Sequence, residues 1–328
     1  MNPIQTNRAS VWQICLLIAC VLLWGCSSTQ VDTREKTDFI LTEKDLIPEG
    51  TAFNSQTNTI YIGSIYKQKI IEIDQNGSVT SKIGVDHFGD LSPIGMEMDL
   101  DRNTLWVNVA LAPIVNQSKS SEWKTTIMAF DMTNHVLRKK YALIDQKMAF
   151  LNDLTVIPNG NIYATETSNS KIYKIDSNTD QLSLYLDLVD FSFPNGITFY
   201  EPLNSLFVAT NEGIIKIELI SKTVSLLQVS DGVDAKVIDG LSIFDNYFIG
   251  HQSTKVSKFY FNEGLTKITR SEVMDSGDEF DSSTTGEVGN GHYYFIVNSQ
   301  IRSGINQQTK SIKPLDSLEE VIIRRMKL

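Results

Sequence analysis

The chain has 328 residues, of which 41% are hydrophobic and 21% are charged. This composition can supply a large core and excludes a disordered or fibrous protein. Aspartate and glutamate outnumber lysine and arginine by 39 to 29, so the formal charge is −10 and a nucleic-acid partner is not expected. Because its three cysteines fall within the first 26 residues, the rest of the chain has no disulfide, cysteine metal ligand or cysteine nucleophile.

An uncharged apolar segment lies near the N-terminus. Residues 11–25, VWQICLLIACVLLWG, are too few for a comfortable membrane span and are typical of a signal-peptide core. The end of this segment, Leu23-Trp24-Gly25-Cys26, resembles the cleavage box of bacterial lipoproteins, in which the cysteine becomes the lipid-modified first residue. Leu17-Ile18-Ala19-Cys20 is a competing box, but cleavage there would leave five apolar residues exposed, so Cys26 is preferred.

We therefore predict a signal peptide over residues 1–25, a lipid-attached tether over 26–37 and a folded domain over 38–328. Ser27 after the cysteine resembles the sorting pattern for the outer rather than the inner membrane. The expected location is the bacterial cell envelope, with the lipid as the only membrane attachment. A secreted protein and a protein held by an uncleaved helix are alternatives, and all three forms are exported.

Repeats fill the folded domain. The segments PEGTAFNSQTNTIYIGSIYKQKIIEID from Pro48 and LNDLTVIPNGNIYATETSNSKIYKID from Leu151 match along their length, and four further copies recur at about 45-residue spacing. Each unit holds four short strands whose residues alternate or run apolar, without the i, i+3, i+4 spacing of a helical solenoid. The sequence predicts an all-β, six-bladed β-propeller. Its last blade has room for Val321–Leu328, and the early stretch Phe39–Thr42 could close the ring.

The residue that opens each repeat is often an oxygen donor. Because the first strand of a propeller blade lies nearest the axis, these positions should converge. Turn chemistry alone favours Asn-Gly and Asp-Gly, but four oxygen donors at one repeat phase favour a metal. Such hard ligands suit calcium, in preference to magnesium or manganese. The six opening residues are Glu49, Ile94, Asn152, Asn195, Asp239 and Thr285.

These motifs resemble those of the gluconolactonase, senescence-marker-protein and luciferin-regenerating-enzyme family, which is related to the paraoxonases and diisopropylfluorophosphatase. The resemblance runs from Pro48 to the end and is carried by Pro48-Glu49-Gly50, Asn152-Asp153, Pro194-Asn195-Gly196 and Asp239-Gly240. It implies a six-bladed propeller with a catalytic calcium on the axis, with Glu49, Asn195 and Asp239 as core ligands and Asn152 as a fourth. Two departures argue against a gluconolactone-like substrate: the family's polyol-binding arginine segment has no match, and Leu154 replaces a usual glycine.

Other residues are expected around this centre. The second strand of each blade returns to the metal face, which places His251 there as a general acid or base beside Asp239. An insertion around Ala110–Thr126 should lie over the same face, as a lid or as a tolerated surface loop. The acidic stretch from Asp275 to Asp281 is expected to be a solvated loop.

The leading hypothesis is an exported, monomeric, calcium-dependent hydrolase of the lactonase or esterase type. Its substrate would be a small ester, lactone or phosphotriester, whose scissile carbonyl or phosphoryl oxygen the metal polarises. Asp239 or His251 would activate the attacking water. The alternative is a non-enzymatic, calcium-stabilised propeller that binds a polysaccharide, a peptide or an envelope protein, because the fold hosts both roles.

Overall fold

The structure is a computed structural model that describes residues 35–112, 124–143 and 148–328. The predicted signal peptide, both candidate cleavage cysteines and most of the Ala110–Thr126 insertion lie outside these ranges. Within them, no helix is long and apolar enough to cross a membrane. The helical content of the described ranges is single turns of 3₁₀-helix: η1 (Lys44–Leu46), η2 (Val85–His87), η3 (Glu201–Leu203) and η4 (Leu315–Ser317).

The first four antiparallel sheets each consist of four consecutive strands. Blade 1 contains β2 (Pro48–Asn54), β3 (Thr59–Ser64), β4 (Lys69–Ile73) and β5 (Val79–Ile83). Blade 2 contains β6 (Ser92–Asp99), β7 (Thr104–Ala110), β8 (Thr125–Asp131) and β9 (Val136–Ala142). Blade 3 contains β10 (Leu151–Val156), β11 (Ile162–Glu166), β12 (Lys171–Asp176) and β13 (Gln181–Asp187). Blade 4 contains β14 (Ile197–Tyr200), β15 (Ser205–Ala209), β16 (Ile214–Glu218) and β17 (Val224–Leu226).

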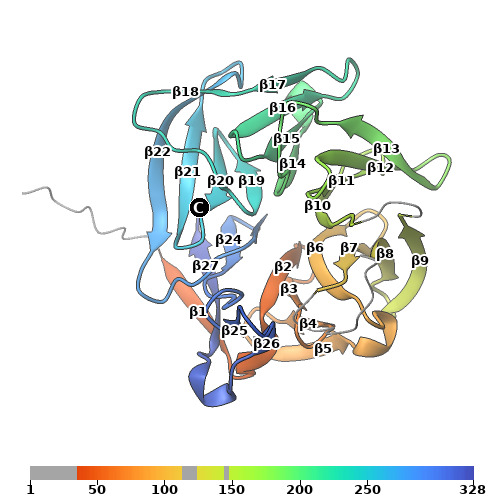
Figure 1. Cartoon of the computed structure of the whole chain (residues 1–328), viewed down its shortest axis with the longest axis vertical. Helices are drawn as coiled ribbons and strands as arrows, with labels where there is room; N and C mark the ends of the chain where they lie inside the picture. Colours follow the sequence, from red (N-terminus) through yellow and green to blue (C-terminus); the bar gives the residue numbers. More distant parts are fainter. Residues whose placement is uncertain (1–34, 113–123, 144–147) are drawn as a thin grey trace, which may run out of the picture. The chain divides into compact units, whose positions relative to one another are not determined.

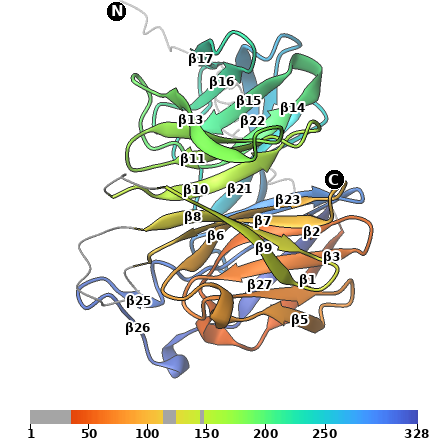
Figure 2. The same ribbon diagram turned by 90° about the vertical axis from the view of Figure 1, so that its right-hand side faces the viewer.

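The last two sheets depart from this pattern. Blade 5 contains β19 (Leu241–Phe244), β20 (Tyr247–His251), β21 (Lys255–Phe261) and β22 (Lys267–Ser276), and β18 (Gln228–Val229) adds to it in parallel. Blade 6 contains β23 (Gly286–Gly289), β24 (His292–Ile296), β27 (Val321–Lys327) and β1 (Lys36–Leu41). The hairpin of β25 (Ile305–Asn306) and β26 (Ser311–Ile312) interrupts blade 6, projecting from the face opposite the C-terminus (Figure 2).

The six sheets surround a common centre, with the labelled first strands β2, β6, β10, β14 and β19 nearest to it (Figure 1). The described residues therefore form a six-bladed β-propeller, as the repeats predicted. Its core lies between neighbouring blades, because strand alternation turns apolar side chains to both faces of each sheet. Ile70, Val107 and Phe130 are fully buried in one such layer, which joins blade 1 to blade 2.

The N-terminal strand closes the ring, as predicted. β1 pairs with β27 in antiparallel register, with Phe39 opposite Ile323 and Leu41 opposite Val321. Blade 6 thus combines one strand from the start of the domain with three from its end. This closure covers the edge that β27 would otherwise expose.

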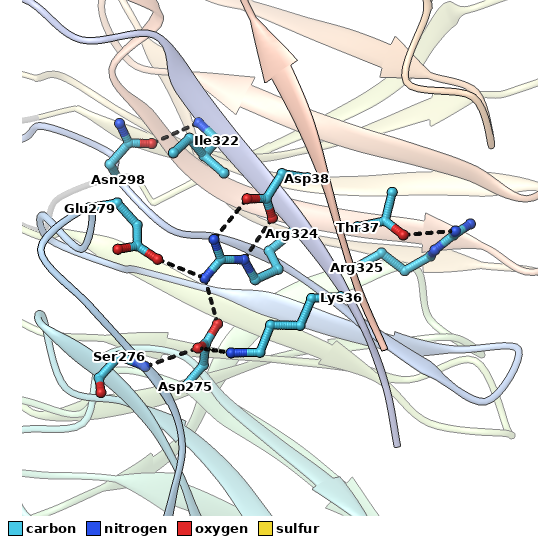
Figure 3. Close-up of polar contacts among 10 residues, drawn as sticks. All are labelled: Lys36, Thr37, Asp38, Asp275, Ser276, Glu279, Asn298, Ile322, Arg324 and Arg325. Carbon is cyan, nitrogen blue, oxygen red and sulfur yellow. Dashed lines mark hydrogen bonds and ion pairs between the residues drawn. The ribbon is translucent and has the colours of Figure 1, made fainter. Parts of the chain in front are cut away.

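A buried arginine fixes this closure (Figure 3). Arg324 on β27 donates to both carboxylate oxygens of Asp38 on β1, at 2.6 and 2.8 Å. It also donates to Asp275 of β22 at 2.7 Å and to Glu279 at 3.0 Å. The expectation that the acidic stretch is simply a solvated loop was wrong for Asp275, which is 4% exposed and also bound by Lys36 at 2.5 Å.

Candidate functional site

Bulges aim the opening residues of the first three blades. The pairing of β2 with β3 skips from Pro48 to Thr51, so Glu49 and Gly50 lie opposite a single residue. The same skip occurs at Ile94 and Gly95 in β6, and at Asn152 and Asp153 in β10. An unpaired bulge residue can turn its side chain out of the ladder, and such bulges are frequent beside functional sites.

Backbone contacts between blades hold these residues in place. The Gly196 N–H donates to the carbonyl of Asp239 at 2.8 Å, and the Gly240 N–H donates to that of Thr284 at 2.7 Å. Glycine is required at such contacts: a Cβ on Gly50 would lie 1.8 Å from the Ile94 carbonyl oxygen. In blade 3, where Asp153 replaces the glycine, its Oδ2 accepts the Ile197 N–H of blade 4 at 3.1 Å instead.

All four predicted metal ligands line one cavity of about 510 Å³: Glu49, Asn152, Asn195 and Asp239. The other two opening residues lie apart from it. Ile94 lines a neighbouring apolar cavity of about 250 Å³, which shares Ile301 with the first. Thr285 donates its hydroxyl to the Glu49 carbonyl at 2.8 Å. Four of the six residues that open the repeats therefore line the same cavity.

The hydrogen bonds within this group leave oxygens free. Asn195 Nδ2 donates to Asp239 Oδ1 at 2.8 Å, and Asn152 Nδ2 donates to Thr167 Oγ1 at 3.0 Å. The nitrogen of each amide thus donates a hydrogen bond, whereas its carbonyl oxygen accepts none from the residues that the structure describes. Glu49 Oε2 is buried and likewise has no partner. An orphaned buried carboxylate oxygen is costly in a protein interior, and a cation beside it would remove that cost.

Repulsion between buried carboxyls adds to the free-energy cost at this site. Burial, together with the nearby Asp239 and Asp153 carboxyls, raises the pKa of Glu49 well above its usual value. Burial also raises the pKa of Asp239 to about 6, against the opposing effects of the Asn195 hydrogen bond and the Arg302 charge. Two buried carboxyls that repel each other need either a proton or a cation between them.

The donor set fits a hard, oxygen-binding ion. In the described ranges no three or more His, Cys, Asp and Glu side chains form a group that could hold a metal. The four predicted ligands instead offer two carboxylates and two amide carbonyls, and oxygen ligands of this kind suit calcium rather than zinc. The residues present therefore fit the ion that the family resemblance implies.

His251 lies deeper than its predicted role requires. The ring is fully buried, with Nδ1 2.8 Å from Ser283 Oγ and Nε2 2.7 Å from Tyr293 Oη. Burial lowers the pKa of His251 to about 3. Both ring nitrogens therefore have partners, and the ring is not among the described residues that line the cavity. Only its backbone meets the site, because the His251 carbonyl accepts the Asp239 N–H at 2.8 Å.

Several residues near the site were assigned no role from the sequence. Lys236, Lys255 and Arg302 line the same cavity as the predicted ligands. A smaller cavity of about 70 Å³ lies among the first strands and is lined by three carboxyls, Glu97, Asp153 and Glu287. Burial raises the pKa of Glu97 to about 8 and that of Asp153 to about 7. Asp153 and Glu287 follow their opening residues by one and two positions, so the repeat phase held a signal for them.

Arg302 had no such signal. It lies between β24 and β27, in a connection that the repeats do not cover. Its place beside the cavity follows from the way blade 6 is interrupted.

No family model matches the sequence, and no curated protein matches it. Solved structures do match. Mala s 1, the major allergen of Malassezia sympodialis, aligns with a TM-score of 0.67 and 12% identity, over 88% of this chain and 96% of that one. A gluconolactonase from Xanthomonas campestris has a TM-score of 0.58 and 12% identity, over 86% of each chain. A luciferin-regenerating enzyme has a TM-score of 0.58 and 12% identity, over 90% of this chain and 96% of that one.

The likeness is one of fold. The gluconolactonase and the luciferin-regenerating enzyme carry the names of the family whose motifs the sequence resembles, and the structure confirms the six-bladed propeller which that resemblance implied. At 12% identity the shared architecture leaves the chemistry to be argued from the cavity itself.

Proposed function

We propose that this chain is an exported, calcium-dependent hydrolase of the lactonase or esterase type. The observation that carries the proposal is the buried, unpartnered Oε2 of Glu49, in a cavity that it shares with Asp239, Asn152 and Asn195. At about 510 Å³, this cavity has the size of a small-molecule site. The adjoining apolar cavity at Ile94 offers room for an uncharged part of a substrate. Export through the signal peptide, the lipid at Cys26 and a monomeric state belong to the proposal as predictions from the sequence.

In this proposal, Glu49, Asp239, Asn152 and Asn195 hold calcium through their side-chain oxygens. When bound, calcium supplies Lewis-acid polarisation of the scissile carbonyl or phosphoryl oxygen. Asn195 fixes Asp239 by its hydrogen bond to Oδ1, which leaves Oδ2 as the atom that can accept a proton from water. The water oxygen then bonds to the acyl carbon, or to the phosphorus of a phosphotriester. The bond from that atom to the alcohol oxygen breaks, and the proton taken up by Asp239 passes to that oxygen.

A second observation favours the alternative, a binding module. Phe193 and Val237 on the rim of the cavity are 52% and 71% exposed. Exposed apolar side chains around a cavity are also what a protein or polysaccharide partner would contact. In that case the calcium would hold the loops in place and no substrate would be turned over.

Calcium titration of the lipid-free chain starting at Ser27, after treatment with a chelator, tests the site. We expect one-site binding that is lost in Asp239→Asn and kept in Asp234→Asn, whose carboxyl lines the same cavity but has no ligand role here. The same three proteins are then assayed with lactones, aryl esters and phosphotriesters, with and without calcium. Calcium-dependent turnover by wild type and Asp234→Asn supports the hydrolase, and binding without turnover supports the module. Equal calcium binding by Asp239→Asn would refute the site.

A further inference from the structure

The candidate site has a basic rim, which we define as Lys236, Lys255 and Arg302. All three line the cavity that holds Glu49 and Asp239. Among the described residues none of the three forms an ion pair. Other cations of the chain, such as Lys36, Arg138 and Arg324, are bound to carboxylates at 2.5 to 3.0 Å. Unpaired positive charge is therefore gathered at this cavity.

One hairpin turn holds the basic rim together. Gln252 Nε2, just after β20, donates to the backbone carbonyls of Asp234 and Lys236, both at 3.1 Å. Ser253 Oγ accepts a hydrogen bond from Arg302 Nη1 at 3.2 Å. Lys255 begins the next strand, β21. The loop before β19, the β20–β21 turn and the connection after β24 are thus tied to one another, so the three cations are placed by the fold.

The charges in the cavity do not cancel. The carboxyls that line it are Glu49, Asp234 and Asp239. The divalent cation of the proposed function neutralises Glu49 and Asp239. Only Asp234 then remains opposite the three cations of the basic rim, so the cavity keeps an excess of two positive charges. The chain as a whole has a formal charge of −10, so this excess is local.

We propose that the substrate of this cavity carries an anionic group, a carboxylate, sulfate or phosphate, which binds the basic rim while its ester or lactone carbonyl lies at Asp239. The inference rests on the proposed function for the reaction and on its calcium for the excess of positive charge, but not on turnover for the anion site. Arg302 offers the planar, two-pronged donor geometry that matches such groups, whereas the two lysines act as point charges. The substrate class is therefore an anionic ester or lactone, in place of the neutral polyols that suit gluconolactonases.

A pair of esters of nearly equal shape, 4-acetoxybenzoate and 4-acetoxybenzamide, isolates the charge. In the calcium-loaded wild type we expect kcat/KM to be at least tenfold higher for the benzoate. Arg302→Gln should reduce the ratio of the two kcat/KM values about tenfold, and Lys236→Gln and Lys255→Gln should reduce it less. Lys313→Gln is the matched control, because Lys313 belongs to the same β24–β27 connection but is not among the described residues lining this cavity or the adjoining apolar one, and its ratio should equal that of wild type.

Calorimetric titration with 4-hydroxybenzoate and with 4-hydroxybenzamide measures the anion site without turnover. We expect the benzoate alone to bind wild type, with affinity that falls in high salt and is lost in Arg302→Gln. Such binding by a protein that hydrolyses neither ester would uphold the anion site and refute the hydrolase. Equal hydrolysis of both esters, or benzoate binding that Arg302→Gln leaves intact, would overturn the anion site and leave the hydrolase standing.

Discussion

The Glu49 side chain destabilises the calcium-free fold, although the proposed calcium site requires it. Its Oε2 is buried without a partner among the described residues, and burial together with the nearby Asp239 carboxyl raises the pKa of Glu49. Glu49→Gln removes the charge and brings an amide that can donate to Asp239. We therefore expect the unfolding free energy of the chelator-treated protein to rise by about 1 kcal/mol, measured by urea denaturation at pH 7.

In saturating calcium, wild type should instead have the higher unfolding free energy, because only wild type gains the free energy of calcium binding. Glu212→Gln is the control, since that carboxylate already accepts bonds from the Ser192 hydroxyl and N–H on the surface. A loss of stability for Glu49→Gln in chelator would show that its carboxylate is not under strain.

The buried ring of His251 makes stability depend on pH. Its pKa is about 3 in the folded protein and about 6.5 when unfolded, so between these values the unfolded chain binds the extra proton. Stability should therefore fall as pH is lowered from 6.5, by about 1.4 kcal/mol per unit from this group. His251→Gln should flatten that slope in urea titrations at pH 5, 6 and 7, and an unchanged slope would count against the buried neutral ring.

Sequence reasoning succeeded where one period governs several residues. Glu49, Asn152, Asn195 and Asp239 share a repeat phase, and the symmetry of a propeller turns equal phase into convergence. His251 was also placed at a strand end by phase, but the direction of its ring depends on Ser283 and Tyr293 in the next blade. Contacts between side chains of different blades leave no periodic trace in a sequence.

At the scale of elements, closure of the ring depends on β1, β22 and β27. Arg324 joins all three, with 8% of its side chain exposed (Figure 3). Removing one partner of a buried ion pair leaves the other charge buried and uncompensated. Arg324→Gln should therefore lower the unfolding free energy by about 3 kcal/mol. Arg325→Gln is the matched control, because the adjacent side chain donates to the neutral Thr37 Oγ1 at 3.2 Å, and it should cost under about 1 kcal/mol. Urea denaturation compares them, and equal losses would contradict this account.

The repeat pattern predicted that β1 and β27 would meet, because the last repeat has room for Val321–Leu328 and Phe39–Thr42 could pair with that blade. It did not predict the ion pairs that Arg324 forms across the two strands. The stretch containing Asp275 and Glu279 has the composition of a solvated loop, and only the length of β22, which carries Asp275 to β27, brings it to Arg324. The structural role of Asp275 thus depends on Arg324, a cation nearly fifty residues away in the chain.

At the scale of the whole molecule, the candidate ligands tie separate blades together. Glu49 belongs to blade 1 and Asn152 to blade 3, while Asn195 and Asp239 immediately precede blades 4 and 5. An ion held by all four would bind only the closed ring, because the unfolded chain scatters them over 190 positions. Calcium at a hundredfold excess over Kd should then raise the unfolding free energy by about 2.7 kcal/mol.

This gain should appear as a shift of one cooperative transition, followed both by tryptophan fluorescence and by circular dichroism in urea. Calcium should leave the midpoint of Glu49→Gln and of Asp239→Asn unchanged, and should shift that of Asp234→Asn as it shifts wild type. A calcium effect that survives both ligand substitutions would place the ion elsewhere. A shift confined to one of two separate transitions would mean that the ion stabilises only part of the ring, since an axial ion must stabilise all the blades that bind it.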